Sequence, residues 1–146
     1  MASNDRRRGG PTEAPPVRKL TTEECLRRLR EGGVGRLAMR TEGAPEIRPV
    51  NFVLDDGRLI VRTGEGSVMR AAKAAEAAGF EVDGVDRLEH TGWSVVVTGK
   101  LRALATNAEL LALPLRPWAD GTRDRFVTLS LDRVSGITIP PGRGNR

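Results

Sequence analysis

The chain has 146 residues, enough for one domain with a buried core of its own. Its net charge is +5, but part of this charge lies in arginines near the two ends, so the basic balance is partly a property of the tails. A single cysteine, Cys25, excludes an internal disulfide and a cysteine-rich metal site and favours a reducing, cytoplasmic location. No apolar run approaches the roughly 18–20 residues of a transmembrane helix, and no apolar stretch follows the first arginines as in a secretory signal, so we expect no membrane segment.

Residues 1–17 are polar and rich in glycine, proline and arginine. Because they have almost nothing to bury, we expect a disordered tail. The same is expected of residues 141–146, which leaves residues 18–140 as one folded domain. The triplet Arg6–Arg8 has no longer basic run and no aromatic platform around it, so nucleic-acid binding is not expected.

The first helix signal is a capping box, with Thr21 as the cap and Glu24 three residues later. The pattern predicts a helix that runs to about Glu31, where two glycines end it. Its buried stripe, at helical spacing, consists of Cys25, Leu26 and Leu29. Cys25 has no base nearby in the sequence, so we interpret it as a core residue rather than a nucleophile.

Alternating apolar residues then predict three strands, Val34–Thr41, Arg48–Leu54 and Leu59–Thr63. The last two are joined by Asp55-Asp56-Gly57, a hairpin turn in which glycine supplies the positive φ. In the second strand, one face carries Val50, Phe52 and Leu54, and the opposite face carries Ile47, Pro49, Asn51 and Val53.

A glycine-rich corner, Gly64–Ser67, follows the third strand and opens a predicted helix over Ser67–Ala77. Free backbone N–H groups, the Ser67 hydroxyl, Arg62 and Arg70 are all expected near this corner, an arrangement that suits an anion such as a phosphate. Ser67 also fits as a helix cap, and the two interpretations are compatible.

The second half of the chain is mostly strand. The expected elements are the strands Gly79–Asp83, Gly92–Ala105, Arg125–Leu131 and Val134–Ile139, a short helix Ala108–Leu113, and a polar connection Gly84–Thr91. The valine run in the longest strand predicts burial on both faces, and Gly99 within it predicts a bulge or a tight bend. His90 has no triad partners, so a general-base role is not expected.

Tight turns between consecutive strands favour antiparallel pairing. Glycines within the strands favour a small barrel, which has no exposed edge. The sequence therefore predicts a mainly β protein, a β-barrel with flanking helices, made from about seven strands and three helices.

Several segments match a known family in order and spacing. They are ECLRRLREGGVGRLA, PEIRPVNFVLDDGRLIVRT, GEGS, FEVDGVD, TGWSVVVTG and LPLRPWADGTRDRFVTL. With them the chain resembles the pyridoxamine 5′-phosphate oxidase-like proteins, the flavin-binding split-barrel group, and especially their short actinobacterial members. The resemblance implies an antiparallel split β-barrel and a homodimer with two FMN sites at the interface.

The resemblance also implies roles for individual residues. Arg48 is expected to reach the flavin phosphate, Thr63 to lie near the flavin, and Ser67 to bind the phosphate. The backbone expected along the isoalloxazine ring is that of Pro49, Val50 and Asn51.

Two tryptophans are assigned in the same way. Trp93 and Ser94 lie on the long strand that helps to complete the partner's site in this family, although Trp93 fits equally well as a core residue. Trp118 lies in a proline-rich loop that often closes over the ring, and an interface role is the alternative.

One position departs from the family pattern. Many relatives have a lysine that pairs with the phosphate where this chain has Val68. Losing one charge-assisted contact costs on the order of 1.5–3 kcal/mol, or roughly ten- to hundredfold in affinity. Compensation is expected from Arg62, Arg70 or Lys73, of which Arg70 lies about one helical turn beyond Ser67.

No acid–base pair stands out in the sequence. This fits a flavin enzyme, in which the cofactor carries the redox chemistry and the protein supplies position and electrostatics. The resemblance therefore implies an FMN-dependent oxidoreductase that acts on a small molecule. Two alternatives remain open: a deazaflavin-dependent reductase on the same fold, and a non-enzymatic flavin- or haem-binding protein.

Overall fold

The computed structural model describes residues 16–116 and 121–141. Its elements in chain order are β1 (Arg18–Lys19), α1 (Thr22–Arg30), β2 (Gly33–Thr41), β3 (Ala44–Asp55), β4 (Arg58–Thr63), α2 (Ser67–Lys73), β5 (Ala77–Asp86), β6 (Thr91–Leu104), α3 (Ala108–Ala112), β7 (Arg125–Ser130) and β8 (Arg133–Ile139). Most of the two predicted tails, and Trp118 with its expected role over the flavin ring, lie outside the described residues.

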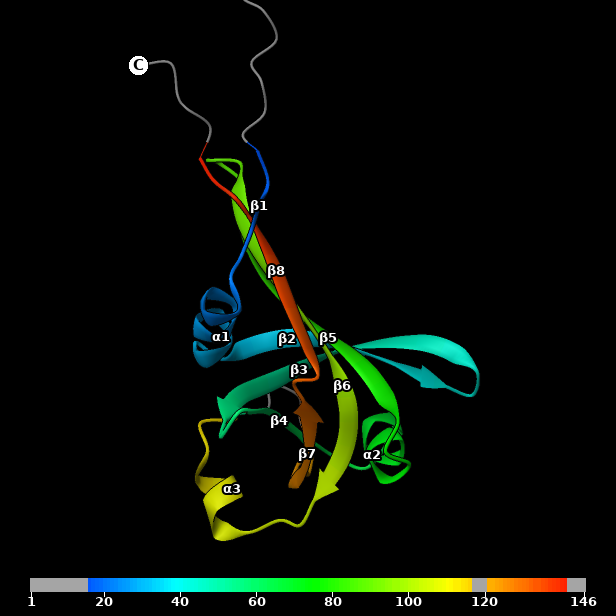
Figure 1. The fold of residues 1–146 in the computed structure, drawn as a ribbon. Coiled ribbons are helices and arrows are strands. Elements are labelled where there is room, and N and C mark those ends of the chain that lie inside the picture. Colours follow the sequence, from blue (N-terminus) through cyan, green and yellow to red (C-terminus); the bar gives the residue numbers. More distant parts are fainter. Residues whose placement is uncertain (1–15, 117–120, 142–146) are drawn as a thin grey trace, which may run out of the picture.

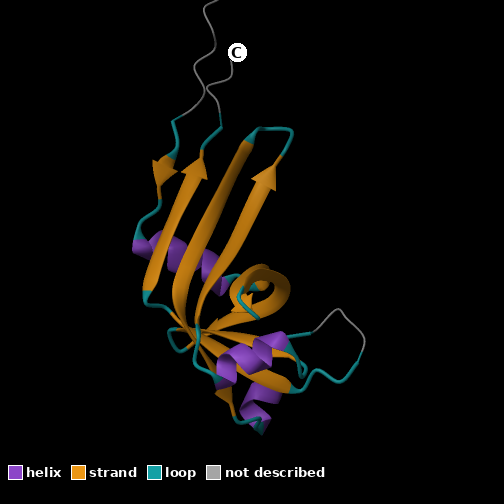
Figure 2. Ribbon diagram, turned by 90° about the vertical axis from the view of Figure 1, so that its right-hand side faces the viewer, coloured by secondary structure: helices purple, strands orange, loops and turns teal. Residues whose placement is uncertain are grey.

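The strands form one antiparallel sheet in the order β1-β8-β6-β5-β2-β3-β4-β7. A further pairing between β6 and β7 closes six of these strands into a barrel, which confirms the predicted split-barrel architecture. β1, β8 and the paired halves of β5 and β6 extend away from the barrel (Figures 1 and 2). We call this four-stranded extension the blade. α1 lies across one of its faces (Figure 2).

β6 belongs to both the barrel and the blade. Its first half, Gly92–Thr98, pairs with β8, and its end, Leu101–Leu104, pairs with β7. Gly99 lies where the strand changes partner, and a Cβ placed there would be 1.8 Å from the carbonyl oxygen of Ser130. The backbones cross too closely at this point for any side chain, as the strand glycine suggested.

Within the single chain, β6 is buried on one face only and not on both as predicted. Val95 and Val97 are buried, but the Val96 residue between them is 41% exposed. Only the face that points to the core and α1 is covered in this chain, because successive side chains of a strand point in opposite directions.

The core fills the barrel and continues beneath α1 and α2. Phe52 and Phe80 meet edge to face at its centre, with ring centroids 4.8 Å apart. Gly35 makes room for them, since a Cβ there would be 2.1 Å from the Phe80 ring. A second, smaller cluster lies under α3 and consists of Ile60, Leu110, Leu115 and Phe126.

The sequence predicted where the helices begin more accurately than where they end. The capping box of α1 is present: Glu24 N donates to the Thr21 hydroxyl, and the Thr21 N donates to the Glu24 carboxylate at 2.7 Å. α2 ends at Lys73, earlier than predicted, because Ala75 adopts a left-handed φ of 51° and β5 begins two residues later. None of the described helices is long and apolar enough to cross a membrane.

Pairing extends β5 beyond its prediction. The strand continues to Asp86, opposite Thr91, so half of the predicted polar connection is strand. The partner strand β6 supplies hydrogen bonds along this whole length, and such tertiary context outweighs the weak β-propensity of aspartate and glycine. His90 lies in the short turn that remains and is exposed.

Candidate functional site

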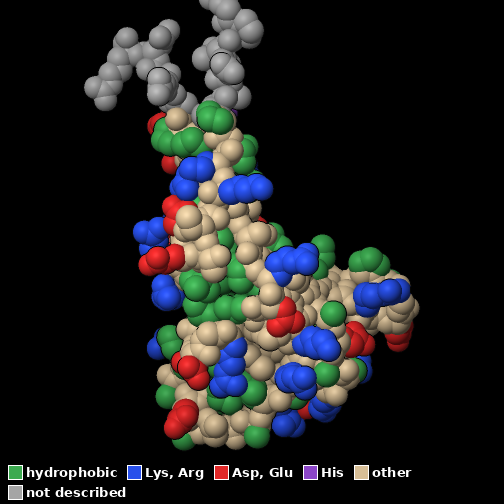
Figure 3. Space-filling view, viewed as in Figure 1, with side chains coloured by type: hydrophobic (Ala, Val, Ile, Leu, Met, Phe, Trp, Pro, Cys, Tyr) green, Lys and Arg blue, Asp and Glu red, His purple; other side chains and the backbone are tan. Residues whose placement is uncertain are grey.

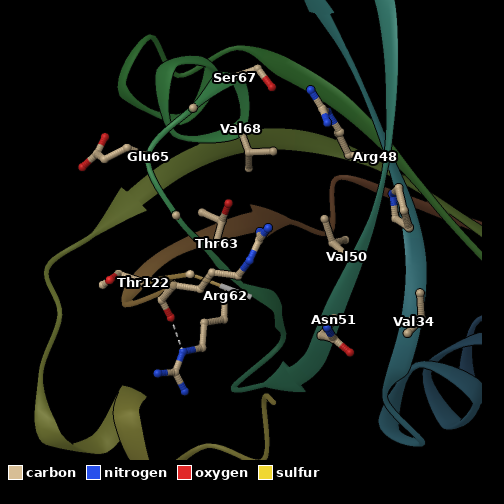
Figure 4. Close-up of a pocket in the computed structure, with 15 residues that line it drawn as sticks. Val34, Arg48, Val50, Asn51, Arg62, Thr63, Glu65, Ser67, Val68 and Thr122 are labelled. Carbon is tan, nitrogen blue, oxygen red and sulfur yellow. Dashed lines mark hydrogen bonds between the residues drawn. The ribbon is translucent and has the colours of Figure 1, made fainter. Parts of the chain in front are cut away.

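A cavity of about 540 Å³ lies between β3, the end of β4, the start of α2 and the segment before β7. This volume is typical of sites for small molecules and cofactors. The cavity brings together seven residues predicted from the sequence, Arg48, Pro49, Val50, Asn51, Arg62, Thr63 and Ser67. Figure 4 shows Arg48 and Ser67 facing one another at one end and Asn51 toward the other.

Two glycines shape the wall of this cavity. Gly64 follows β4, and a Cβ there would be 3.1 Å from the Thr122 carbonyl oxygen, so the bare backbone lets the two segments approach. Gly66 has a φ of 149°, which favours glycine, and it is the N-cap of α2. The interpretation of Ser67 as a cap is therefore wrong: Ser67 is the first residue of the helix, and its hydroxyl is free to bond elsewhere.

That hydroxyl bonds to Glu46, a residue that the sequence reasoning missed. Ser67 Oγ donates to Glu46 Oε1 at 2.9 Å, and Arg48 Nε donates to the same oxygen. The Thr41 hydroxyl donates to the other oxygen, Oε2. These hydrogen bonds, with that from Thr41 the largest effect, lower the pKa of Glu46 to about 2. Both predicted phosphate ligands thus hold a carboxylate of this chain.

The sequence carried a partial signal for this contact. Glu46 and Arg48 are two residues apart on β3, so their side chains share a face of the strand. The contact with Ser67 spans 21 residues and depends on how α2 docks against the β2–β3 hairpin. No local pattern predicts that docking.

Arg62 lines the cavity but is bound to the backbone. Its Nε donates to the carbonyl oxygen of Arg123 at 2.5 Å, and its Nη1 donates to that of Leu115 at 3.2 Å (Figure 4, dashed line for the first). The guanidinium carbon also lies 5.5 Å from the centroid of the Phe126 ring. Arg62 therefore fastens the cavity wall to the cluster under α3.

The position of the family's lysine is closed to a cation. Val68 is 7% exposed and packs in the main core while its side chain lines the cavity. Arg70 and Lys73 are exposed and do not line the cavity, and the Lys73 ammonium lies 3.9 Å from the Glu65 carboxylate. Neither residue therefore lies where it could replace the family's lysine in this cavity.

Arg123 is a second residue that the sequence reasoning missed. It lines the cavity, and its Nε is buried with no hydrogen-bond partner in the described part of the chain. It comes two residues before β7, which pairs with the end of β4, so Thr63 lies opposite Arg125. The β4–β7 register is what carries Arg123 to the cavity.

The described lining residues include one carboxylate, Glu65, and no histidine or cysteine. Glu65 is paired with Arg125 at 2.9 Å and lies 3.9 Å from Lys73. The cavity thus offers cations, hydroxyls and backbone groups, which bind and orient a ligand. It does not present a pair of side chains suited to general acid–base catalysis.

Trp93 and Ser94 do not reach this cavity within the chain. They line a second hollow, of about 470 Å³, on the blade. The Trp93 ring packs against the main core, and the Arg28 guanidinium lies 4.6 Å from its centroid. Their expected role in a partner's site stays a prediction.

The face of the blade opposite α1 is uncovered in the described chain and carries several exposed apolar side chains. Register places Ser94 opposite Ile137 and Val96 opposite Ser135, so these side chains share a face. The exposed apolar residues of this face are Val85, Val96, Ile137 and Ile139. Figure 3 has the viewpoint of Figure 1 and shows the blade nearly edge-on, so this face points to the side there.

Comparisons with known proteins agree with this architecture. The family model for pyridoxamine 5′-phosphate oxidase matches residues 21–138. An uncharacterized protein of Mycobacterium tuberculosis is 34% identical over 140 residues, which cover 91% of this chain and 92% of that protein.

Two solved structures are similar along nearly their whole length. A Corynebacterium glutamicum protein, provisionally named a pyridoxamine 5′-phosphate oxidase, has a TM-score of 0.74 and 29% identity, covering 88% of this chain and 97% of that one. The FAD binding protein of Mycobacterium smegmatis has a TM-score of 0.65 and 25% identity, covering 86% and 100%. With the family model matched along most of its length, the chain belongs to the pyridoxamine 5′-phosphate oxidase family.

Proposed function

We propose that this protein is a flavin-dependent oxidoreductase that binds FMN in the cavity between β3, β4 and α2. The observation that carries the proposal is the cavity itself, which has the volume of a cofactor site and is lined by the strand segment Arg48–Asn51 that the family resemblance assigned to flavin. A relative of the same fold, from Mycobacterium smegmatis, is an FAD binding protein. The ring would lie along Pro49–Asn51 and near Thr63, with the phosphate beside one of the arginines that line the cavity.

The cofactor would supply hydride transfer, which protein side chains do not perform by themselves. The described residues then have the tasks of binding and orientation. The half-buried Asn51 offers an amide to a polar ring edge, and Val50 and Val68 give apolar contacts from the core side. The lack of an acid–base pair among the lining residues fits this division of labour, and the substrate would be a small organic molecule.

We also propose that the protein acts as a homodimer. The exposed apolar side chains gathered on the uncovered face of the blade support this, because such groups are typical of protein interfaces. In such a dimer Ser94, on the uncovered face, would contribute to the site of the other subunit, whereas the Trp93 side chain packs on the opposite face beside Arg28 of α1. Each site would then need both copies.

Flavin binding can be tested on the purified protein. We expect a yellow protein with a bound-flavin spectrum, or a colourless protein that gains this spectrum saturably when FMN is added. A protein that stays colourless and gives no saturable spectral change would refute the proposal.

A deazaflavin-dependent reductase is the second candidate. Val68 favours this candidate. Without the family's lysine the site lacks one contact to the compact phosphate of FMN, which reduces its preference for FMN over a deazaflavin cofactor with a longer acidic tail. Competition between FMN and the deazaflavin cofactor distinguishes the two. A preference for FMN of more than about tenfold, or roughly 1.4 kcal/mol, would exclude this candidate.

A non-enzymatic flavin- or haem-binding protein is the third candidate. It is favoured by the absence of acid–base partners among the described lining residues. Reduction of an electron acceptor by a nicotinamide, measured with the FMN-loaded protein against the same concentration of free FMN, separates an enzyme from a carrier. Turnover above the free-flavin background would exclude a pure carrier.

A further inference from the structure

We propose that Glu46 determines where an anionic ligand binds in this cavity: its carboxylate occupies Arg48 and Ser67, and Arg123 is the cation that receives the ligand's phosphate. The inference rests on the proposed function for the identity of the ligand. The assignment of the phosphate to Arg123 rests on the contacts of the described residues.

Glu46 holds the two groups that the family pattern reserves for phosphate. Its Oε1 accepts hydrogen bonds from Arg48 and from Ser67, and its Oε2 accepts from Thr41. The Glu46 side chain is 18% exposed, so it is enclosed rather than free in solvent. The charge of Glu46 offsets that of Arg48, and the Ser67 hydroxyl already donates its hydrogen bond to Glu46.

A phosphate placed at this end would meet a carboxylate. Two like charges that share a site repel, and both cannot stay ionised there without a cost. Binding between Arg48 and Ser67 would therefore require Glu46 to give up its hydrogen bonds to these two residues. Binding of the ligand's phosphate elsewhere in the cavity avoids this cost.

The other candidate cations are either hydrogen-bonded to the backbone or lie outside the cavity. Arg62 donates to two backbone carbonyls, and Arg70 and Lys73 do not line the cavity. Arg123 lines it, and its Nε is buried without a partner among residues 16–116 and 121–141. Buried donors are nearly always hydrogen-bonded, and an arginine has five donors in a planar fork that matches a phosphate.

The backbone of Arg123 is held in place for such a role. Arg62 binds its carbonyl oxygen at 2.5 Å, and Thr122 beside it packs on Gly64. Thr63 and Thr122 line the same cavity. A phosphate monoester bound here would fill the unused hydrogen-bonding capacity of Arg123.

The test compares FMN with riboflavin, which has the same ring and no phosphate. The ratio of their dissociation constants reports the phosphate contact alone. We expect Arg123→Gln to lower this preference for FMN by roughly tenfold or more, with riboflavin affinity nearly unchanged, and Arg123→Lys to restore part of it. Arg70→Gln, which removes an exposed cation outside the cavity, is the matched control and should leave the ratio unchanged.

Glu46→Gln gives the second arm. It should release Arg48 and increase the preference for FMN, and only in this background should Arg48→Gln reduce the preference. If Arg48→Gln in the wild-type background abolishes the preference while Arg123→Gln does not, the assignment is overturned.

A flavin-free measurement separates this inference from the proposed function. Inorganic phosphate is titrated into the full chain while the arginine Nε–H signals are followed by NMR. We expect a saturable shift of the Arg123 signal and a smaller response from Arg48. A saturable response confined to Arg48, or none at Arg123, overturns the inference whether or not flavin binds.

Discussion

The Ser67 hydroxyl donates a hydrogen bond of 2.9 Å to Oε1 of Glu46 and joins the first turn of α2 to β3 across 21 residues. The same oxygen accepts from Arg48, so one carboxylate collects the two side chains that the family resemblance assigns to phosphate. This end of the cavity is held together before any ligand arrives. Its residues therefore affect stability as well as binding.

The first prediction concerns the pH dependence of stability. The pKa of Glu46 is lowered in the folded chain from 4.5 to about 2, so its contribution is fully present above the unfolded value and is lost as the pH falls toward the folded value. Glu46→Gln lacks this contribution. The difference in free energy of unfolding between wild type and variant should shrink as the pH is lowered from about 5 toward about 2.

Urea unfolding at a series of pH values measures this difference. Glu42→Gln, at the exposed tip of the same hairpin, is the control and should show no such trend. If the difference in free energy of unfolding between wild type and Glu46→Gln stays constant across the acid range, the hydrogen bonds to Glu46 do not stabilise the fold as described.

The second prediction concerns Arg62. Arg62→Gln removes two hydrogen bonds to backbone carbonyls, which should cost about 1–2 kcal/mol in stability and speed amide exchange in residues 121–125. Because Arg62 binds the carbonyl oxygen of Arg123, its loss should also loosen Arg123 and weaken FMN binding more than riboflavin binding. Unchanged amide exchange in residues 121–125 would contradict the support that Arg62 gives to this segment.

The third prediction concerns the point where β6 leaves the blade. A methyl group at Gly99 would collide with the Ser130 carbonyl oxygen, so Gly99→Ala should destabilise the chain by about 2–3 kcal/mol, the scale of overpacking in a core. Gly79→Ala is the matched control on β5, where the nearest atom to a new Cβ is 3.8 Å away. Chemical denaturation should show a large loss for the first variant only. Equal losses would mean that strand propensity, not the crossing, sets the effect.

The fourth prediction concerns assembly. If the uncovered face of the blade is the dimer interface, the wild type should have twice the chain mass of 15.8 kDa in light scattering. Ile137→Asp places a charge on that face and should shift the protein toward the monomer. Leu88→Asp, at an exposed turn residue outside the face, should remain dimeric. A monomeric wild type would contradict the proposal.

The sequence predicts those features that depend on neighbours along the chain. The capping box of Thr21 and Glu24, the two-residue period around Phe52 and the hairpin turn before β4 are all local, and all are present. Strand glycines predicted a barrel because close backbone crossings need them, and Gly99 lies at such a crossing.

The remaining features depend on contacts between distant segments. The two-residue strand β1 forms only because β8 offers it an edge, and its residues are exposed. Glu46 meets Ser67 only after α2 docks, and Arg123 enters the cavity only through the register of β4 with β7. A single sequence carries no local pattern for such pairings, so the cavity was predictable from the resemblance but the Glu46 carboxylate that binds Arg48 and Ser67 was not.

The most direct test of the central claim places a bulky side chain in the cavity. Asn51 lines it, whereas Ile47, on the same face of β3, is 68% exposed and lies outside it. We predict that wild type and Ile47→Trp bind FMN saturably in a fluorescence titration, and that Asn51→Trp binds at least about tenfold more weakly. Equal FMN affinity in Asn51→Trp and wild type, with both folded, would contradict the location of the flavin in this cavity.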